Sequence, residues 1–189
     1  MLLVAIETTS RVAGVALFDG DSLVASIERE GRGDMVLPLV DELLSARGLA
    51  PKDIARWAVD VGPGSFTGVR VGVSTVKGIA FATGAEIVAV DAFEALAEGR
   101  EAIALLDAGK GEVYFRIPGG EPGHATLDAV RASIAGRPEP VVGPGIPPRA
   151  EAVGRLALTR AASDVDRLEP LYVRAPDLTR PSAAAAPRR

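Results

Sequence analysis

Short apolar runs alternate with amphipathic segments along most of the chain, and this alternation predicts an α/β fold. Residues 2–6 form a continuous apolar run, as expected for a central strand. Two more strand-like runs, residues 12–18 and 23–27, flank an Asp-Gly pair, which favours a hairpin turn. The chain is therefore predicted to begin with three antiparallel strands.

Two helices with unusual apolar faces are predicted next. In residues 34–47 the apolar side chains spread over about 200° of the helix, about twice the arc of an ordinary surface helix, so two packing partners are expected. A strand at 57–61 and a glycine turn precede the second helix, which runs to a stop at Gly84. One arc of this helix should pack on a sheet and contains Val69, Val73, Val76 and Ala80.

The other arc of the second helix is small and barely polar, and it contains Val71, Thr75, Gly78 and Ala82. Gly72 and Gly78 each disfavour a helix by about 1 kcal/mol relative to alanine. Close approach of another helix or chain is the expected compensation.

The remaining elements define two lobes and a tail. In order, they are a strand at 86–90, a helix at 91–97 capped by Asp91, strands at 102–106 and 112–117, a loop at 118–124, a helix at 127–135 capped by Thr126, a strand at 141–142 and a helix at 149–161. The predicted domains are an N-terminal lobe at 1–100, a shortened C-terminal lobe at 101–174 and a disordered tail at 175–189.

Composition narrows the classes of function. The 189 residues are 48% hydrophobic and carry a formal net charge of -4, so the chain has a core but no basic field for nucleic acid. Cysteine is absent and one histidine is present, which excludes disulfides and any multi-histidine metal site built from this chain alone. Without an apolar run of roughly 18 residues or a signal peptide, a cytoplasmic protein without membrane contact is expected.

A glycine-rich loop precedes the second helix, and its notable residues are Gly62, Gly64, Ser65, Thr67 and Gly68. Such loops can cradle phosphates. Its spacing fits neither a Walker A loop nor a dinucleotide fingerprint. A tight turn with a helix cap from Ser65 or Thr67 is the favoured interpretation.

Three polar groups remain. Weak candidates for cofactor binding follow the first strand, in a turn made of Glu7, Thr8, Thr9 and Ser10. A cluster of Asp107, Lys110, Glu112 and Tyr114 is interpreted as a salt-bridged turn. His124, in a Gly/Pro-rich loop without a nearby acid, is expected at the surface.

Together these residues resemble the TsaB (YeaZ) family of subunits for threonylcarbamoyladenosine formation in tRNA. The segments that carry the resemblance are 6–10, 61–72, 75–78, 107–114 and 170–176. The family implies an actin-like, sugar-kinase-like fold of two related lobes with mixed sheets flanked by helices. Three departures are Glu7, where the family usually has Asp, residues 33–35, where many members have Asn-His-Ser-Glu, and Gly109, where Arg is usual.

The resemblance implies a non-catalytic scaffold with no catalytic residue, metal or cofactor of its own. The catalytic paralogue TsaD would bind through the two helices, TsaE would join the complex, and ATP, metal and tRNA would be bound by the partners or the complex. A homodimer could use the same helices. The expected partner interface contains Val36, Leu37, Val40, Leu44, Arg70, Val71, Ser74, Thr75, Lys77, Gly78 and Ala82.

Two other classes of function compete with the scaffold. A small ATP-dependent phosphotransferase of the sugar- or acetate-kinase type is the main alternative, although the second lobe offers no second glycine-rich nucleotide motif. A peptidase is the third class, and Ser65 has no obvious base to activate it.

Overall fold

The computed structural model describes residues 1–31 and 35–174. The predicted helix start at Asp34, the departure from the family at residues 33 and 34, and the predicted disordered tail at 175–189 lie outside these residues.

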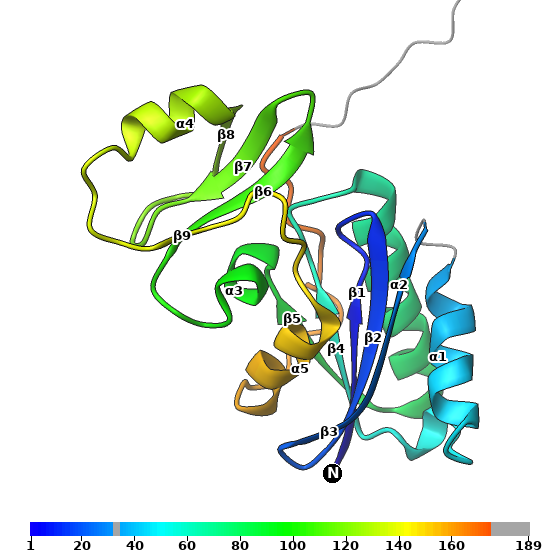
Figure 1. Ribbon diagram of the computed structural model, residues 1–189. Coiled ribbons are helices and arrows are strands. Elements are labelled where there is room, and N and C mark those ends of the chain that lie inside the picture. The colour runs from blue at the N-terminus through cyan, green and yellow to red at the C-terminus, as the bar shows by residue number, and fades with distance from the viewer. Residues whose placement is uncertain (32–34, 175–189) are drawn as a thin grey trace, which may run out of the picture.

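The N-terminal part is built on a five-stranded mixed sheet with the order β3-β2-β1-β4-β5 (Figure 1). β1, β2 and β3 are antiparallel, as predicted, whereas β4 and β5 run parallel to β1. The strands are β1 (Leu2–Glu7), β2 (Val12–Asp19), β3 (Ser22–Glu30), β4 (Arg56–Asp60) and β5 (Glu86–Val90). Both faces of the central strands are buried, which explains why their sequences are apolar runs without alternation.

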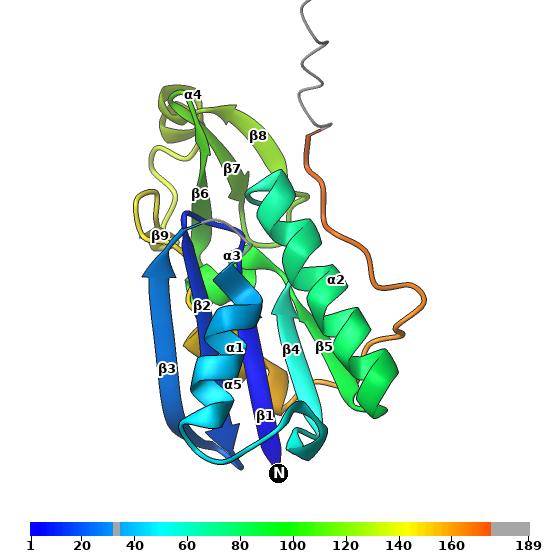
Figure 2. The same cartoon turned by 90° about the vertical axis from the view of Figure 1, so that its right-hand side faces the viewer.

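Two helices cover one face of this sheet, α1 (Val36–Ser45) and α2 (Phe66–Thr83) (Figure 2). The predicted sheet-facing stripe of α2 is confirmed, because Val69, Val73, Val76 and Ala80 are at most 5% exposed. The short 3-10 helix η2 (Pro51–Asp53) links α1 to β4. None of the helices formed by residues 1–31 and 35–174 has the length and apolar character needed to cross a membrane.

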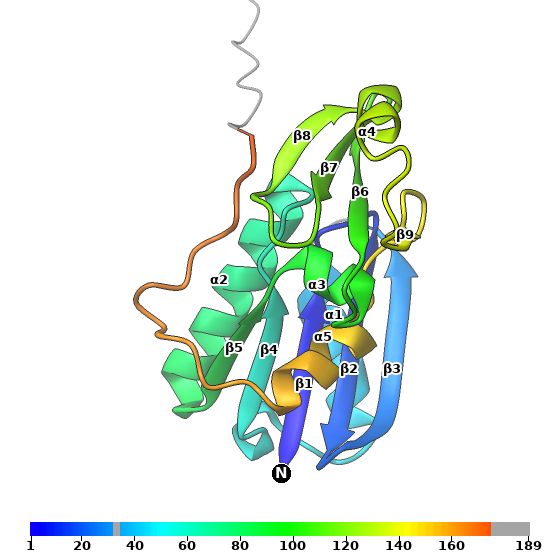
Figure 3. The ribbon, with the colours of Figure 1, turned by 90° about the vertical axis from the view of Figure 1, so that its left-hand side faces the viewer.

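The opposite face of the sheet is covered by α5 (Ala150–Leu158), and α3 (Ala92–Ala97) lies between this face and the second sheet (Figure 3). The sequence had assigned residues 149–161 to the second lobe, but α5 packs on β1, β2 and β4. The reason is its row of small residues: a Cβ on Gly154 would lie 2.2 Å from the Phe18 ring. The predicted helix at 149–161 therefore packs with the first sheet, although it follows the second sheet in sequence.

The second sheet has four strands in the order β8-β7-β6-β9. They are β6 (Ile103–Gly109), β7 (Glu112–Arg116), β8 (Gly123–Thr126) and β9 (Val141–Val142), with α4 (Leu127–Ser133) against one face. Strand β8 falls at the end of the predicted loop at 118–124. The sequence pattern did not predict this strand, because the glycine- and proline-rich segment has a low strand propensity. Its stability comes from pairing with β7.

Residues 162–174, here called the C-terminal strap, return from α5 along the edge of β5 and the side of α2 (Figure 2). Ser163 N donates to Ile87 O at 2.7 Å, and the Leu168 side chain enters the core between the sheet and α2. Farther along, Leu171 N donates to Val61 O at 2.7 Å. The strap thus covers the free edge of the sheet and connects it to the second lobe.

Candidate functional site

The glycine-rich loop before α2 packs directly on the turn that follows β1. Ser65 N donates to Thr9 O at 2.6 Å, and Thr8 Oγ1 donates to Gly68 O at 2.7 Å. A Cβ on Gly64 would lie 2.3 Å from Thr9 O, and one on Gly68 would lie 1.9 Å from Thr8 O. Glycine is therefore required at both positions for backbone to approach backbone.

Ser65 caps α2, because its Oγ accepts the Gly68 N–H at 3.2 Å. The structural interpretation of the loop is thereby confirmed for Ser65, whereas Thr67 is exposed. Gly62 has φ of +100°, which explains glycine at that position. The prediction that Gly72 admits another helix or chain is wrong: its Cβ would meet Thr8 Oγ1 at 2.5 Å, within this chain.

Two carboxyl groups are buried beneath the loop, Glu7 at the end of β1 and Asp60 at the end of β4. Glu7 Oε1 accepts from Thr9 N and Thr9 Oγ1, each at 2.5 Å. The same Thr9 Oγ1 lies 3.4 Å from Asp60 Oδ2, while Asp60 Oδ1 accepts the Gly62 N–H at 2.8 Å. The two carboxyl groups thus share one hydroxyl.

Burial dominates the electrostatics of this pair. It raises the pKa of Glu7 to about 7, although hydrogen bonds from Thr9 and Ser10 oppose the shift. Burial and the neighbouring charge of Glu7 raise the pKa of Asp60 well above its ordinary value. The sequence analysis missed Asp60, for which the signal was a lone acid in the apolar strand Trp-Ala-Val-Asp.

A cleft of about 940 Å³ lies between the two sheets. Thr9 and Ser10 line it, whereas Glu7 and Thr8 are 1% and 2% exposed and do not. The glycine-rich loop forms another wall, and the strap closes one side with Tyr172 and Arg174. Of the predicted cofactor-binding turn, therefore, two residues reach a cavity and two belong to the core.

The polar cluster of the second lobe differs from the predicted salt-bridged turn. Asp107 Oδ1 accepts the Gly109 N–H at 2.8 Å, and Lys110 has φ of 56° at the hairpin tip. Glu112 pairs instead with His124 and Arg174, each at 3.1 Å. The prediction of a surface histidine without an acid was wrong, because the missed strand β8 places His124 beside β7 with its side chain 18% exposed.

The predicted partner surface is only partly available. Val36, Val40 and Leu44 of α1 are at most 4% exposed, because the sheet and α2 already cover the wide apolar arc, and Leu37 alone of the four α1 residues is free, at 58%. Two predicted interface residues of α2 hold the strap: Arg70 Nε donates to Tyr172 OH at 2.8 Å and Lys77 Nζ to Leu168 O at 3.2 Å.

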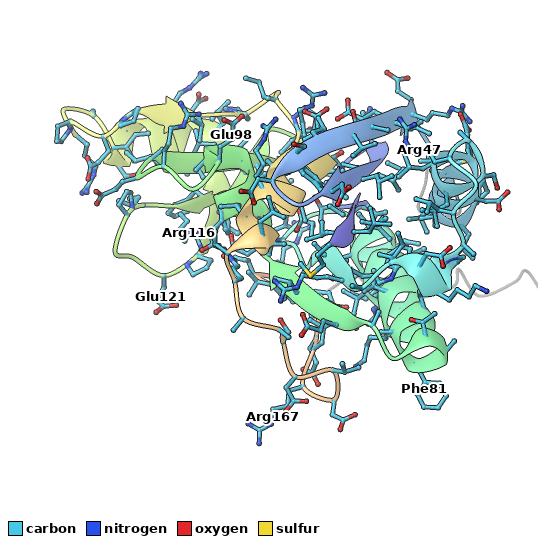
Figure 4. The ribbon with its side chains drawn as sticks, turned by 90° about the horizontal axis from the view of Figure 1, so that it is seen from below. Arg47, Phe81, Glu98, Arg116, Glu121 and Arg167 are labelled. Carbon is cyan, nitrogen blue, oxygen red and sulfur yellow. The ribbon has the colours of Figure 1, made fainter. Side chains whose placement is uncertain are left out.

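The outer face of α2 is left as an uncharged surface, formed by Val71, Ser74, Thr75, Gly78, Phe81 and Ala82. Nothing lies within 4 Å of a Cβ built on Gly78. Phe81, which the sequence analysis missed, is 93% exposed and projects from the end of the helix (Figure 4). Aromatic residues are enriched at protein interfaces, so Phe81 beside an uncharged helix face is available for contact with another protein.

Substitution of two glycines of α2 tests the difference between the tightly packed Gly68 and the open Gly78. Gly68→Ala should destabilise the fold by about 3 kcal/mol, because the new methyl group overlaps the Thr8 carbonyl. The matched change Gly78→Ala should stabilise it by about 1 kcal/mol, because the site is open and alanine favours the helix. Urea denaturation measures both. Equal effects of the two changes would contradict the described contact.

Known proteins resemble this chain in sequence and in fold. Residues 33–161 match the family model described as TsaD, tRNA N6-adenosine threonylcarbamoyltransferase. The tRNA threonylcarbamoyladenosine biosynthesis protein TsaB of Bacillus subtilis is 35% identical over 122 residues, which cover 60% of this chain and 53% of the relative. TsaB of Escherichia coli is 32% identical over 124 residues, covering 61% and 54%. The chain thus spans about half the length of the curated relatives it matches.

Two solved structures from Pseudomonas aeruginosa share the fold. A protein described as similar to the peptidase YeaZ superposes with a TM-score of 0.74 at 24% identity, over 92% of this chain and 99% of that one. YeaZ itself superposes with a TM-score of 0.73, also at 24% identity, over 90% and 99%. The predicted α/β fold of two lobes, with mixed sheets flanked by helices and a shortened second lobe, is confirmed, and it is the fold of the YeaZ structures.

Proposed function

The chain belongs to the family that includes TsaD and TsaB, and we propose that it acts as a TsaB-type scaffold in threonylcarbamoyladenosine formation on tRNA. In this role it binds a catalytic TsaD-type partner and carries out no chemistry itself. TsaE joins through that complex, and the site of action is the cytoplasm.

The observation that carries the proposal is the outer face of α2. It is uncharged, it has an open glycine at its centre, and it ends in an aromatic side chain that is 93% exposed. Small residues allow a second helix to approach closely, and an exposed phenylalanine can fill a pocket on the partner. Leu37 of α1, 58% exposed, is a further apolar contact. A second copy of this chain could occupy the same face in the absence of the partner.

Size-exclusion chromatography with light scattering tests the proposal directly. Purified chain mixed with a TsaD protein from the same organism is expected to elute with the mass of a heterocomplex. Separate elution of the two proteins at concentrations above about 10 μM would contradict the proposed role, since specific complexes of standard size bind more tightly.

Binding of tRNA provides a second test. The chain has a net charge of -4, so alone it should bind tRNA weakly or not at all in about 150 mM salt. An electrophoretic mobility shift with the chain, the partner and their mixture would show whether binding belongs to the complex. Tight binding by this chain alone would refute the proposed division of labour.

The phosphotransferase alternative would use the cleft between the two sheets, but the buried acid of the candidate turn weighs against it. Glu7, the carboxylate of the turn that would face a nucleotide, is 1% exposed and hydrogen-bonded to Thr9. The glycine-rich loop is packed on that turn. Incubation of the pure protein with ATP, with hydrolysis as the readout, separates the two functions.

A further inference from the structure

A second cavity, of about 590 Å³, lies outside the cleft, where α3 and the end of α5 meet the base of the second sheet. Three arginines line it, and they come from different segments. Arg100 lies between α3 and β6, Arg116 ends β7, and Arg160 follows α5. Figure 4 shows Arg116 where the two parts of the molecule meet. Such convergence of guanidinium groups has no role in the proposed scaffold.

Two of these arginines are held in position by carboxylates of α3 and its cap. Arg116 Nη1 lies 2.7 Å from Asp91 Oδ2, and its guanidinium group is 5.1 Å from the centre of the Phe93 ring. Arg160 Nη1 lies 2.9 Å from Glu94 Oε2. A guanidinium group has five N–H donors in a rigid plane, so one such contact leaves several donors for a ligand.

The third arginine is anchored differently. Arg100 Nε donates to Ala97 O at 3.1 Å, and the residue is exposed. This bond uses Nε, and the two terminal nitrogens have the geometry for a bidentate contact with a ligand. Thr159 adds a hydroxyl to the lining, and Phe93 and Leu156 add apolar surface.

The carboxylates near the pocket offset the positive charge of the three arginines. Asp91 and Glu94 pair with two arginines, and Glu101 also lines the pocket. Three guanidinium groups therefore face three carboxylates, and the net local charge is close to zero. Recognition must then rest on directed N–H donors, which favours a planar or tetrahedral group of oxygen atoms over a simple halide ion.

We propose that this pocket binds a small molecule that carries an oxyanion, a phosphate or a carboxylate group, through Arg100, Arg116 and Arg160. Arg116 and Arg160 provide preorganised donors on one side, and Arg100 closes over the ligand from the rim. The apolar side chains of Phe93 and Leu156 accommodate the remainder of the ligand.

Isothermal titration calorimetry of the full chain in a Tris chloride buffer tests the site, with sodium phosphate in one arm and sodium citrate in the other. Saturable binding is expected in at least one arm, and the responding arm identifies the type of oxyanion. Arg100→Gln should weaken that binding about tenfold by removing one charge-assisted contact. Arg116→Lys should also weaken it, because lysine keeps the charge beside Asp91 but loses the planar fork.

Arg131→Gln on α4 is the matched control, since it removes an arginine that is also exposed and does not line the pocket. It should bind as the unmutated chain does. The proposal is overturned if neither phosphate nor citrate gives saturable heat, or if Arg131→Gln weakens binding as much as Arg100→Gln.

Discussion

Gly78→Arg is expected to leave the chain folded and to abolish its binding to a TsaD-type partner. A Cβ at this position meets nothing within 4 Å, so the arginine can extend into solvent in the free chain. In a complex through the outer face of α2, the same side chain would prevent close helix approach and bury an unpaired charge. A buried unpaired charge costs several kcal/mol, which corresponds to a loss of affinity of about 100-fold or more.

Val73→Arg provides the contrast within the same helix. Val73 is 5% exposed and packs between α2 and the sheet, so arginine there should unfold the chain or lower its melting temperature strongly. Thermal melting and sizing with the partner are measured for both variants. If Gly78→Arg binds with unchanged affinity, or melts as early as Val73→Arg, the partner does not use this face.

Phe81→Ala refines the same prediction without adding a charge. The side chain is 93% exposed, so its removal should not change the melting temperature. Loss of an aromatic anchor should weaken the complex by about 2 kcal/mol or more, measured by titration calorimetry. Unchanged affinity would exclude Phe81 from the interface even if Gly78 belongs to it.

In the α2 region, the sequence predicted the local features but not the contacts with distant residues. Periodicity identified its buried stripe, and glycine spacing identified the turn, because both depend on local geometry. The sequence did not show why glycine is needed at position 72. The residue that leaves no room for a side chain there is Thr8, which is distant in sequence, and such contacts produce no periodic pattern. Likewise, the wide apolar arc of α1 was correctly read as needing two partners, but both lie within the chain.

Long-range placement accounts for the remaining errors. The small residues of α5 are compatible with either sheet, and only the fit of Gly154 to Phe18 determines which one it covers. The pairing of Glu112 with His124 depends on β8, whose composition is that of a loop. The three arginines of the second pocket are spread over residues 100–160, without a motif that would have joined them.

The buried pair of Glu7 and Asp60 should make the fold less stable as pH rises. Burial raises the pKa of Glu7 from 4.5 to about 7, so the folded state holds the proton more tightly than the unfolded chain. This contribution to the free energy of unfolding is complete below about pH 4.5 and is lost as pH rises through about 7. A shift of this size corresponds to about 3 kcal/mol, which urea denaturation at pH 5 and pH 8 would detect.

Asp60→Asn should reduce this pH dependence, because it removes the second buried carboxyl group, while the part caused by burial of Glu7 remains. Thr9 Oγ1 donates to Glu7 Oε1 at 2.5 Å and lies 3.4 Å from Asp60 Oδ2, and its oxygen can also accept from a donor at position 60. Asparagine supplies that donor without an ionisable group, and its carbonyl can still accept the Gly62 N–H. Asp60→Ala removes the acceptor of the Gly62 N–H and should be destabilised at both pH values. If Asp60→Asn loses stability between pH 5 and pH 8 as steeply as the unmutated chain, Asp60 does not contribute to the pH dependence of the fold.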